Sequence, residues 1–182
     1  MRSQRLSRAG LKYILKKEDN IAMRNIEHAT AADRQEILKL YKIQLGREFC
    51  PWNEYYPGEE EIDFDLSRDS LLVMREEGKI IAAISIDDDE AVKTLPFWSE
   101  DLQPSGEVSR LAVLPEYQNQ GIAREMIHKA MEVLKERGFV SIHFLVNRLN
   151  TKAMKSYEKL NFNKVGEIEL FNQPMFCYEK EL

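Results

Sequence analysis

The spacing of apolar residues predicts one long amphipathic helix in the second half of the chain. Six apolar residues recur at helical intervals after Gly121, namely Ile122, Met126, Ile127, Ala130, Met131 and Leu134. Arg137 and Gly138 close the pattern, as a basic residue and a glycine commonly do at a helix C-terminus. We therefore expect a helix between Gly121 and Gly138.

Three shorter helices are indicated by weaker patterns. Thr30 is a suitable N-cap for a helix whose apolar residues recur between positions 37 and 45. A short acidic helix is expected over residues 59–66. Asn150 is a suitable N-cap for a last helix, and Asn161 is suited to the left-handed conformation that often ends a helix.

Seven segments have the apolar character of β-strands. They are residues 25–29, 71–75, 80–86, 107–113, 140–146, 163–170 and 175–180. The second and third are joined by a turn with a glycine, which predicts a hairpin, and residues 87–105 are expected to form a loop. Because a strand, the long helix and another strand follow one another from residue 107 to 146, we expect a parallel crossover within a mixed sheet.

Composition places the chain among globular proteins. Its 182 residues, 43% of them hydrophobic and 31% charged, suffice for one core without disulfides. Cys50 and Cys177 match no disulfide framework or metal-ligand spacing, which favours a reducing, cytoplasmic location. The longest apolar run, residues 80–86, is far shorter than the roughly 20 residues that span a membrane. The net charge of −5 argues against a nucleic-acid partner.

The first 22 residues differ from the rest in charge, with six basic and two acidic residues. This composition is typical of a targeting leader. A tag-like remnant, an additional helix, or residues upstream of a true start at Met23 would have the same composition. We therefore assign residues 1–22 to a basic extension and residues 23–182 to a single domain.

The segment between the strand at 107–113 and the long helix has the character of an anion-binding turn. It comprises Gln118, Asn119, Gln120, Gly121, Ile122, Ala123 and Arg124. The free N–H groups and positive dipole end of a helix N-terminus bind phosphate without a lysine, and small side chains allow close approach. The pattern alone is weak, because many strand-to-helix turns contain a glycine. The chain has none of the glycine-rich loops typical of ATP or dinucleotide sites.

Two stretches resemble the signature motifs of GNAT acetyltransferases. Residues 108–123 read VSRLAVLPEYQNQGIA, which is similar to the family's acetyl-CoA signature, Gln/Arg-x-x-Gly-x-Gly/Ala after a Leu-x-Val strand. Residues 150–162 read NTKAMKSYEKLNF and resemble the family's Asn-x-x-Ala-x-x-x-Tyr-x-x-x-Gly-Phe stretch. The first motif departs from the common pattern at Gln118, Asn119 and Ala123, where arginine, glycine and glycine are usual.

The resemblance implies a fold and a cosubstrate. The fold would be mixed α/β, with six to seven mostly antiparallel strands flanked by about four helices and splayed between the fourth and fifth strands. The pantetheine arm of acetyl-CoA would lie in that gap. Contacts would come from Leu111, Ala112, Val113, the turn from Gln118 to Arg124, and Asn150. No metal is expected.

The resemblance also implies how an amine would be acetylated. A lysine-like amine is almost entirely protonated at pH 7, so a proton acceptor is needed. Glu107 is the candidate general base, although an ion pair with Arg110 would explain it equally well. The backbone N–H of Val113 would stabilise the oxyanion. Tyr157 is the candidate acid that protonates the departing thiolate, the alternative being a core tyrosine with a satisfied hydroxyl.

The acceptor is an amine of unknown identity, either a cationic small molecule or a protein amine. Carboxylates and aromatic rings that suit a cation gather around the insertion at residues 49–58, namely Glu48, Trp52, Glu54, Tyr55, Tyr56, Glu59, Glu60 and Glu61. A solvated acidic helix with packed aromatics would explain the same residues, and residues 87–90 are expected to be a charged loop tip.

Two alternatives remain open. A ping-pong route through Cys50 is disfavoured, because no His/Asp arrangement can be assigned to this thiol. A non-catalytic acyl-CoA-binding module would keep the turn but lack turnover. Neither a membrane partner nor a particular oligomer is indicated, and a homodimer is one option.

Overall fold

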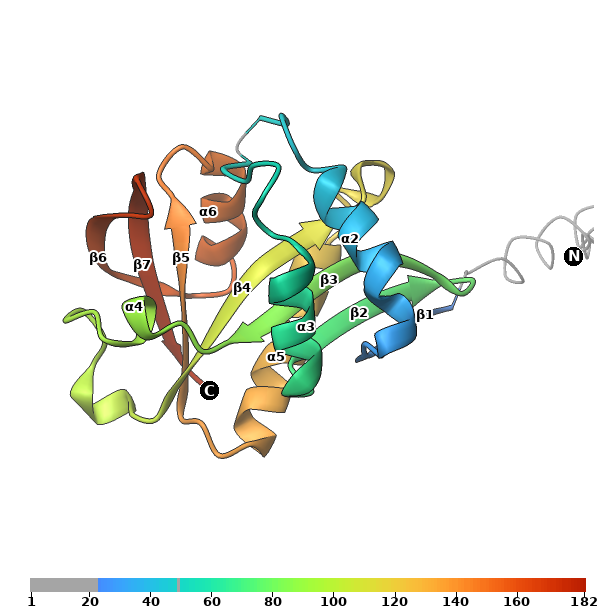
Figure 1. Ribbon diagram of the computed structural model, residues 1–182. Coiled ribbons are helices and arrows are strands. Elements are labelled where there is room, and N and C mark those ends of the chain that lie inside the picture. The colour runs from blue at the N-terminus through green and yellow to red at the C-terminus, as the bar shows by residue number, and fades with distance from the viewer. Residues whose placement is uncertain (1–22, 49) are drawn as a thin grey trace, which may run out of the picture.

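A seven-stranded sheet with helices on both faces forms the body of the protein (Figure 1). The computed structural model describes residues 23–48 and 50–182, so the extension assigned to residues 1–22, and Phe49, lie outside the described residues. The strand order is β1-β2-β3-β4-β5-β7-β6. Every neighbouring pair is antiparallel except β4 and β5, which are parallel. The expected mixed, mostly antiparallel sheet is confirmed.

The elements follow the order that the hydrophobic pattern predicts. The strands are β1 (Arg24–His28), β2 (Leu71–Glu76), β3 (Lys79–Asp87), β4 (Ser105–Val113), β5 (Ser141–Asn147), β6 (Asn163–Leu170) and β7 (Gln173–Glu181). The helices are α2 (Arg34–Lys42), α3 (Glu59–Ser67), α4 (Glu90–Lys93), α5 (Ile122–Glu136) and α6 (Thr151–Glu158). Short 3-10 turns occupy Ala31–Asp33, Glu100–Leu102 and Pro115–Tyr117. No helix in residues 23–48 and 50–182 is long and apolar enough to cross a membrane.

The prediction that residues 87–105 form a loop is wrong in part, because the segment contains the helix α4. Four residues are too few to produce a helical periodicity in the sequence. The helix is nucleated by Asp89, whose carboxylate accepts a hydrogen bond from the N–H of Ala91 at 2.8 Å. The polar segment is therefore shaped by capping rather than by an apolar stripe.

The local signals at Asn150, Asn161 and Gly121 are confirmed, whereas the N-cap of α2 is Asp33 and not Thr30. The side-chain oxygen of Asn150 accepts the N–H of Ala153 at 3.0 Å and so caps α6. Asn161 has a φ of 57°, as expected for a left-handed C-terminal residue. Thr30 precedes a 3-10 turn, and its N–H and hydroxyl donate to the carboxylate of Asp33. Gly121 begins α5 with a φ of 89°, a conformation that favours glycine.

The core lies on both faces of the central strands. The helices α2 and α3 cover one face of the sheet and α5 covers the other (Figure 1). Residues 80–86 of β3 are all buried, as expected for a strand covered on both sides. Where α5 crosses β4, a Cβ on Gly106 would lie 2.2 Å from Cδ2 of Leu134. The absent side chain lets the helix approach the strand closely.

The strands β4 and β5 separate after a short parallel ladder. Their register contains only three pairs, ending at Glu107 and His143. On the other side of β4, Ser109 pairs with Ser85 and Ala112 pairs with Ala83, so Arg110 and Leu111 both oppose Ile84. This is a β-bulge, and Arg110 has a φ of 50° within it. The expected splay between the fourth and fifth strands is therefore present.

Candidate active site

The separation of β4 from β5 leaves a cavity of about 1260 Å³. Residues 107–113 of β4 and 144–147 of β5 form its walls. Twelve residues predicted from the sequence line it: Glu107, Leu111, Ala112, Val113, Gln118, Asn119, Gly121, Ile122, Ala123, Arg124, Asn150 and Tyr157. Gln120 does not, because its side chain binds Arg24 and the carbonyl of Glu116. The structure thus brings together groups that are up to 50 positions apart in the sequence.

The turn before α5 presents unpaired backbone donors to this cavity. Within the described residues, the N–H groups of residues 119–123 have no backbone or side-chain acceptor. The first N–H groups that bond locally are those of Arg124 and Glu125, which both donate to the carbonyl of Gly121. Free donors at the positive end of a 15-residue helix form an anion site.

The backbone of Val113 also points into the gap. The N–H of Leu114 donates to the carbonyl of Ile81 on β3 at 2.9 Å. Because successive N–H groups alternate sides along a strand, the N–H of Val113 points away from β3, toward the space between β4 and β5. Its carbonyl accepts the side-chain amides of Gln44 at 3.2 Å and Gln118 at 3.1 Å.

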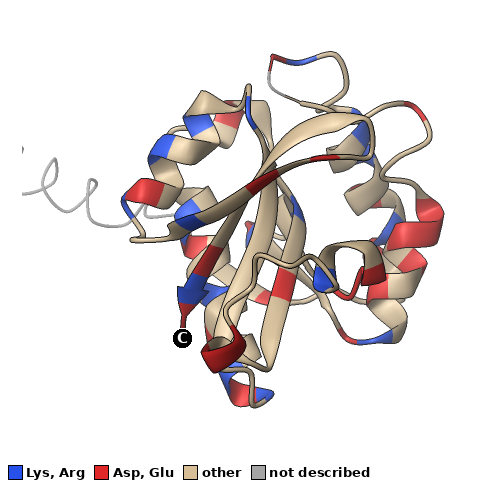
Figure 2. Cartoon of the chain, turned by 90° about the vertical axis from the view of Figure 1, so that its left-hand side faces the viewer, with Lys and Arg blue, Asp and Glu red and all other residues tan. Residues whose placement is uncertain are grey.

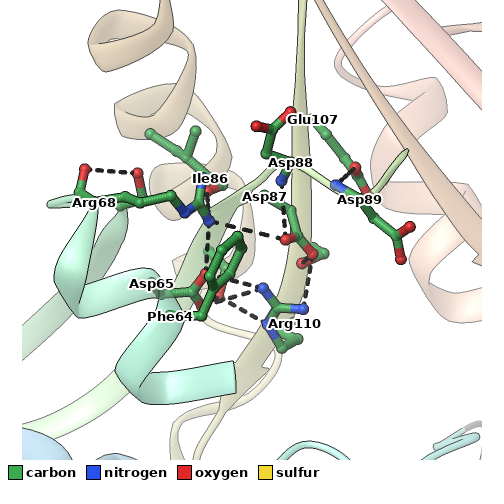
Figure 3. Close-up of polar contacts among 12 residues, drawn as sticks. Phe64, Asp65, Arg68, Ile86, Asp87, Asp88, Asp89, Glu107 and Arg110 are labelled. Atoms are coloured by element: carbon green, nitrogen blue, oxygen red, sulfur yellow. Dashed lines mark hydrogen bonds and ion pairs between the residues drawn. The ribbon is translucent and has the colours of Figure 1, made fainter. Parts of the chain in front are cut away.

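A buried charge cluster lies beside the cavity and is centred on Arg110 (Figure 3). Its guanidinium pairs with Asp65 at 3.0 Å and with Asp87 at 2.7 Å, and all three side chains are almost completely buried. The hydroxyl of Ser109 also donates to Asp87, at 2.6 Å. Although burial raises the pKa of Asp87, these partners hold it below its ordinary value. Asp87 therefore carries a fixed negative charge.

Glu107 is buried beside this cluster but is not neutralised by it. Within the described residues no cationic nitrogen lies within 4.0 Å of its carboxylate, so the alternative of an ion pair with Arg110 is wrong. The N–H of Asp89 donates to Glu107 at 3.1 Å (Figure 3). Burial raises the pKa of Glu107 to about 8, and the charge of Asp87 adds to the rise. Its strand neighbour His143 is neutral, since burial lowers the pKa of that ring to about 4.

Tyr157 lines the same cavity as Glu107. Its ring packs on Phe144, at 4.4 Å between centroids, and Phe144 directly follows the β5 partner of Glu107. No hydrogen bond to its hydroxyl forms within the described part of the chain. Burial raises the pKa of Tyr157 to about 12, and nearby Tyr178 adds to the rise. The hydroxyl is therefore protonated at neutral pH and available as a donor.

The proposed acceptor wall contains fewer residues than the sequence suggested. Of the eight acidic and aromatic residues predicted to surround the acceptor, only Glu48, Trp52 and Tyr56 line the cavity. Tyr55 is 81% exposed, and the acidic residues of α3 do not reach the cavity. The assignment of residues 87–90 to a charged loop tip is wrong, because Asp87 ends β3 with a buried side chain and lines the cavity together with Asp89.

Most charges that line the cavity are grouped by sign. Asp87, Asp89 and Glu107 lie near the start of β4, with Arg110 paired to Asp87. Most cationic residues lie at the other end, where Arg124 is in the first turn of α5, Lys152 and Lys155 are on α6, Lys159 is its C-cap, and Arg47 is followed by Glu48. The seven residues of β4 from Glu107 to Val113 span roughly 20 Å. Elsewhere, acidic and basic residues are interspersed along the elements in the view of Figure 2. Within the described residues no group of three His, Cys, Asp or Glu side chains is arranged to hold a metal ion.

Comparison with known proteins gives one consistent result. The profile of the Acetyltransferase (GNAT) family matches residues 36–162. The ribosomal protein bS18 alanine N-acetyltransferase of Escherichia coli K12 is 35% identical over 54 residues, which are 30% of this chain and 36% of that protein. The alignments with curated relatives thus span about a third of those relatives' length.

Solved structures resemble the whole sheet. The PaiA N-acetyltransferase of Thermoplasma acidophilum, solved in complex with coenzyme A, has a TM-score of 0.68 at 16% identity and covers 88% of this chain and 99% of its own. The ribosomal-protein-alanine N-acetyltransferase of Brucella melitensis has a TM-score of 0.67 at 23% identity, covering 87% of this chain and 99% of its own. At these identities the likeness concerns the fold.

The buried carboxyl of Glu107 should make stability depend on pH. The pKa in the folded protein, about 8, exceeds the ordinary 4.5, so the folded state retains a proton that the unfolded chain releases. The stabilisation is complete below pH 4.5 and is lost as the pH rises through 8. Glu107→Gln does not titrate, and its melting temperature should exceed that of the parent by at least about 3 °C at pH 9, but not at pH 4.5.

Thermal melts between pH 4.5 and 9 measure this difference. The matched control is Glu54→Gln, which removes a carboxyl from an exposed loop position. A difference between Glu107→Gln and the parent that stays constant over this range would contradict a raised pKa.

Proposed function

The chain belongs to the GNAT acetyltransferase family, and on this premise we propose that it transfers an acetyl group from acetyl-CoA to a primary amine by direct attack. One observation carries the proposal: four features line a single cavity. They are the turn with free N–H groups, the β-bulge whose backbone lies outside the regular pairing with β3, a buried carboxyl and a tyrosine hydroxyl. Acyl transfer from a nucleotide thioester uses each of these groups.

The turn before α5 suits the pyrophosphate of acetyl-CoA. Its N–H groups at residues 119–123 are free, and the absence of a side chain on Gly121 leaves them open to close approach. From there the pantetheine arm would follow β4 toward Glu107, over roughly 20 Å of strand. The N–H of Val113, which points into the gap, would bind an amide of that arm.

The N–H of Val113, which the sequence suggested as the oxyanion donor, lies far along β4 from Glu107. The oxyanion donor and the base act on the same acetyl group, so a donor closer to Glu107 than Val113, which is six residues along β4, is preferable. The bulge offers a nearer donor. Leu111 is four residues from Glu107, lines the cavity and lies outside the regular ladder with β3. We assign the oxyanion to the bulge N–H at this residue.

Proton transfer accompanies the change of bonds at the carbonyl carbon. The amine nitrogen forms the new C–N bond, and the C–S bond breaks as the tetrahedral centre collapses. The proton lost by the amine passes to the carboxylate of Glu107, through a bridging water. The hydroxyl of Tyr157 protonates the leaving sulfur and regains its proton from solvent. With a pKa of about 8, Glu107 is ionised in only about one tenth of molecules at pH 7.

The acidic end of the cavity supports a positively charged acceptor. Asp89, which has no ion-pair partner within the described residues, lies beside Glu107, and the rings of Trp52 and Tyr56 line the same cavity. Such a site attracts a protonated amine before it loses its proton to the base. The E. coli relative is named for an alanine amine on a ribosomal protein, so protein amines belong among the candidates.

Acetyl-CoA should bind the parent protein and release thiol only when an amine is present. At a hundredfold excess over its dissociation constant, a ligand stabilises the folded state by about 2.7 kcal/mol, which should raise the melting temperature by several degrees. Thiol release is measured at pH 8.5 with polyamines, lysine and alanine-starting peptides, with the N-acetylated form of each amine as control. An unchanged melting temperature would remove the basis of the proposal, and binding without thiol release would favour a non-catalytic module.

Two isosteric substitutions at Gly121 should separate charge from backbone strain. Asn and Asp both tolerate the left-handed conformation of this residue better than other side chains do. Gly121→Asp adds a negative charge at the proposed pyrophosphate site, and Gly121→Asn does not. We expect Asp to weaken acetyl-CoA binding at least about tenfold more than Asn, measured by calorimetry. Equal affinities of the two variants would place the phosphates elsewhere.

Tyr157→Phe should slow the chemical step without weakening binding. The variant keeps the ring contacts with Phe144 and loses only the hydroxyl. General acids contribute about 10²- to 10⁴-fold, and because a thiolate is a fair leaving group we expect a loss near 10²-fold in single-turnover acetyl transfer. The matched control is Tyr178→Phe, which removes a hydroxyl from the same aromatic cluster outside the cavity lining. Unchanged transfer by Tyr157→Phe would assign this residue to packing alone.

A further inference from the structure

Two cations from separate elements converge on the turn before α5. The side-chain oxygen of Gln118 accepts a hydrogen bond from Nη2 of Arg47 at 3.4 Å and another from Nζ of Lys152 at 3.2 Å. Arg47 lies in the segment between α2 and α3, and Lys152 is the second residue of α6. The turn is therefore bridged from both sides of the cleft.

These two cations lack an anionic partner within the described residues. Neither forms an ion pair there, and their common acceptor is a neutral amide. Both side chains are exposed, so water screens their mutual repulsion in the free protein. An anion placed between them would replace that repulsion with two charge-assisted hydrogen bonds. The arrangement is therefore complementary to a bound anion.

A comparison with Arg110 shows what distinguishes the pair. Arg110 also lines the cavity, but Asp65 and Asp87 neutralise it, so it has no charge to offer a ligand. Arg47 and Lys152 line the same cavity at the opposite end, next to the free N–H groups of residues 119–123. The only polyanionic part of acetyl-CoA that reaches these N–H groups in the proposed function is its pyrophosphate.

We propose that Arg47 and Lys152 form a cationic clamp that closes over the pyrophosphate of acetyl-CoA. The clamp rests on the proposed function, and it supplies the positive charge that the turn itself lacks at Gln118. On binding, both cations would exchange the amide oxygen of Gln118 for phosphate oxygens. The amide of Gln118 stays bound to the carbonyl of Val113 and keeps the turn attached to β4.

The clamp is tested by combining three variants with three ligands. The variants are Arg47→Gln, Lys152→Gln and their double, with Lys135→Gln as the matched control. Lys135 is an exposed lysine in the last turn of α5, about 20 Å from the turn. The ligands are acetyl-CoA, acetyl-3′-dephospho-CoA, which keeps the pyrophosphate, and S-acetyl-pantetheine, which has no phosphate. Dissociation constants are measured by calorimetry for the nucleotides and by NMR titration for acetyl-pantetheine.

Each single substitution should weaken both nucleotides about tenfold and the double about a hundredfold, while acetyl-pantetheine and the control remain unchanged. The dependence of nucleotide affinity on salt should also be shallower in the double variant, because fewer charges contact phosphate. Melting temperatures of the free variants should match the parent, since both side chains are exposed.

Three outcomes would overturn the clamp while leaving the proposed function intact. Parent-like affinity of the double variant for acetyl-CoA would show that the cations do not contact the ligand. A loss seen with acetyl-CoA but absent with the 3′-dephospho form would assign them to the 3′-phosphate. An equal loss for acetyl-pantetheine would indicate a structural effect. Failure of the parent itself to bind acetyl-CoA would overturn the proposed function and the clamp together.

Discussion

The point at which β4 stops pairing with β5 determines the rest of the site. Each strand keeps its outer partner, β3 or β7, so the sheet remains continuous on both sides while its centre opens. Backbone groups that face the gap, such as the N–H of Val113, are left without a strand partner. Buried polar groups of this kind are unfavourable unless something binds them. The opening therefore creates both the space for a substrate and the donors that would bind it.

The bulge at Arg110 links this geometry to the electrostatics of the site. A left-handed φ is uncommon for a residue with a side chain, and here two buried carboxylates hold the guanidinium in place. Removing that cation would leave Asp87 without its 2.7 Å partner and, within the described residues, Asp65 with Arg68 alone, and the loss of one partner from a buried ion pair is strongly destabilising. Because Arg110 is fully occupied by them, Glu107 has no counter-ion. One ion cluster thus stabilises the bulge and leaves the pKa of the neighbouring Glu107 raised.

Local chemistry explains which features could be predicted from the sequence. The caps at Asn150 and Asn161 depend on residues a few positions apart, and so does the turn at Gly121. All the motif residues proposed as site residues except Gln120 line the cavity. The burial of Asp87 depends on Arg110 and on the fold of β3 against β4, contacts that no local pattern contains. Arg47 and Lys152 converge on Gln118 only because the segment after α2 and the start of α6 both approach the turn. Because such contacts between distant segments cannot be read from local patterns, the sequence predicts too many residues of the aromatic insertion at the cavity.

In the proposed mechanism, the raised pKa of Glu107 bears on which amine this carboxylate would deprotonate. Transfer of a proton from a lysine-like ammonium, with a pKa near 10.4, to an ordinary glutamate of pKa 4.5 is unfavourable by about 8 kcal/mol. With the pKa of Glu107 at about 8, the same transfer is unfavourable by about 3 kcal/mol. An α-amino group, with a pKa of about 7.7 to 8.0, would exchange its proton with this carboxylate at almost no cost. Burial without a counter-ion would therefore bring Glu107, in its proposed role as base, close to the proton affinity of a chain-terminal amine.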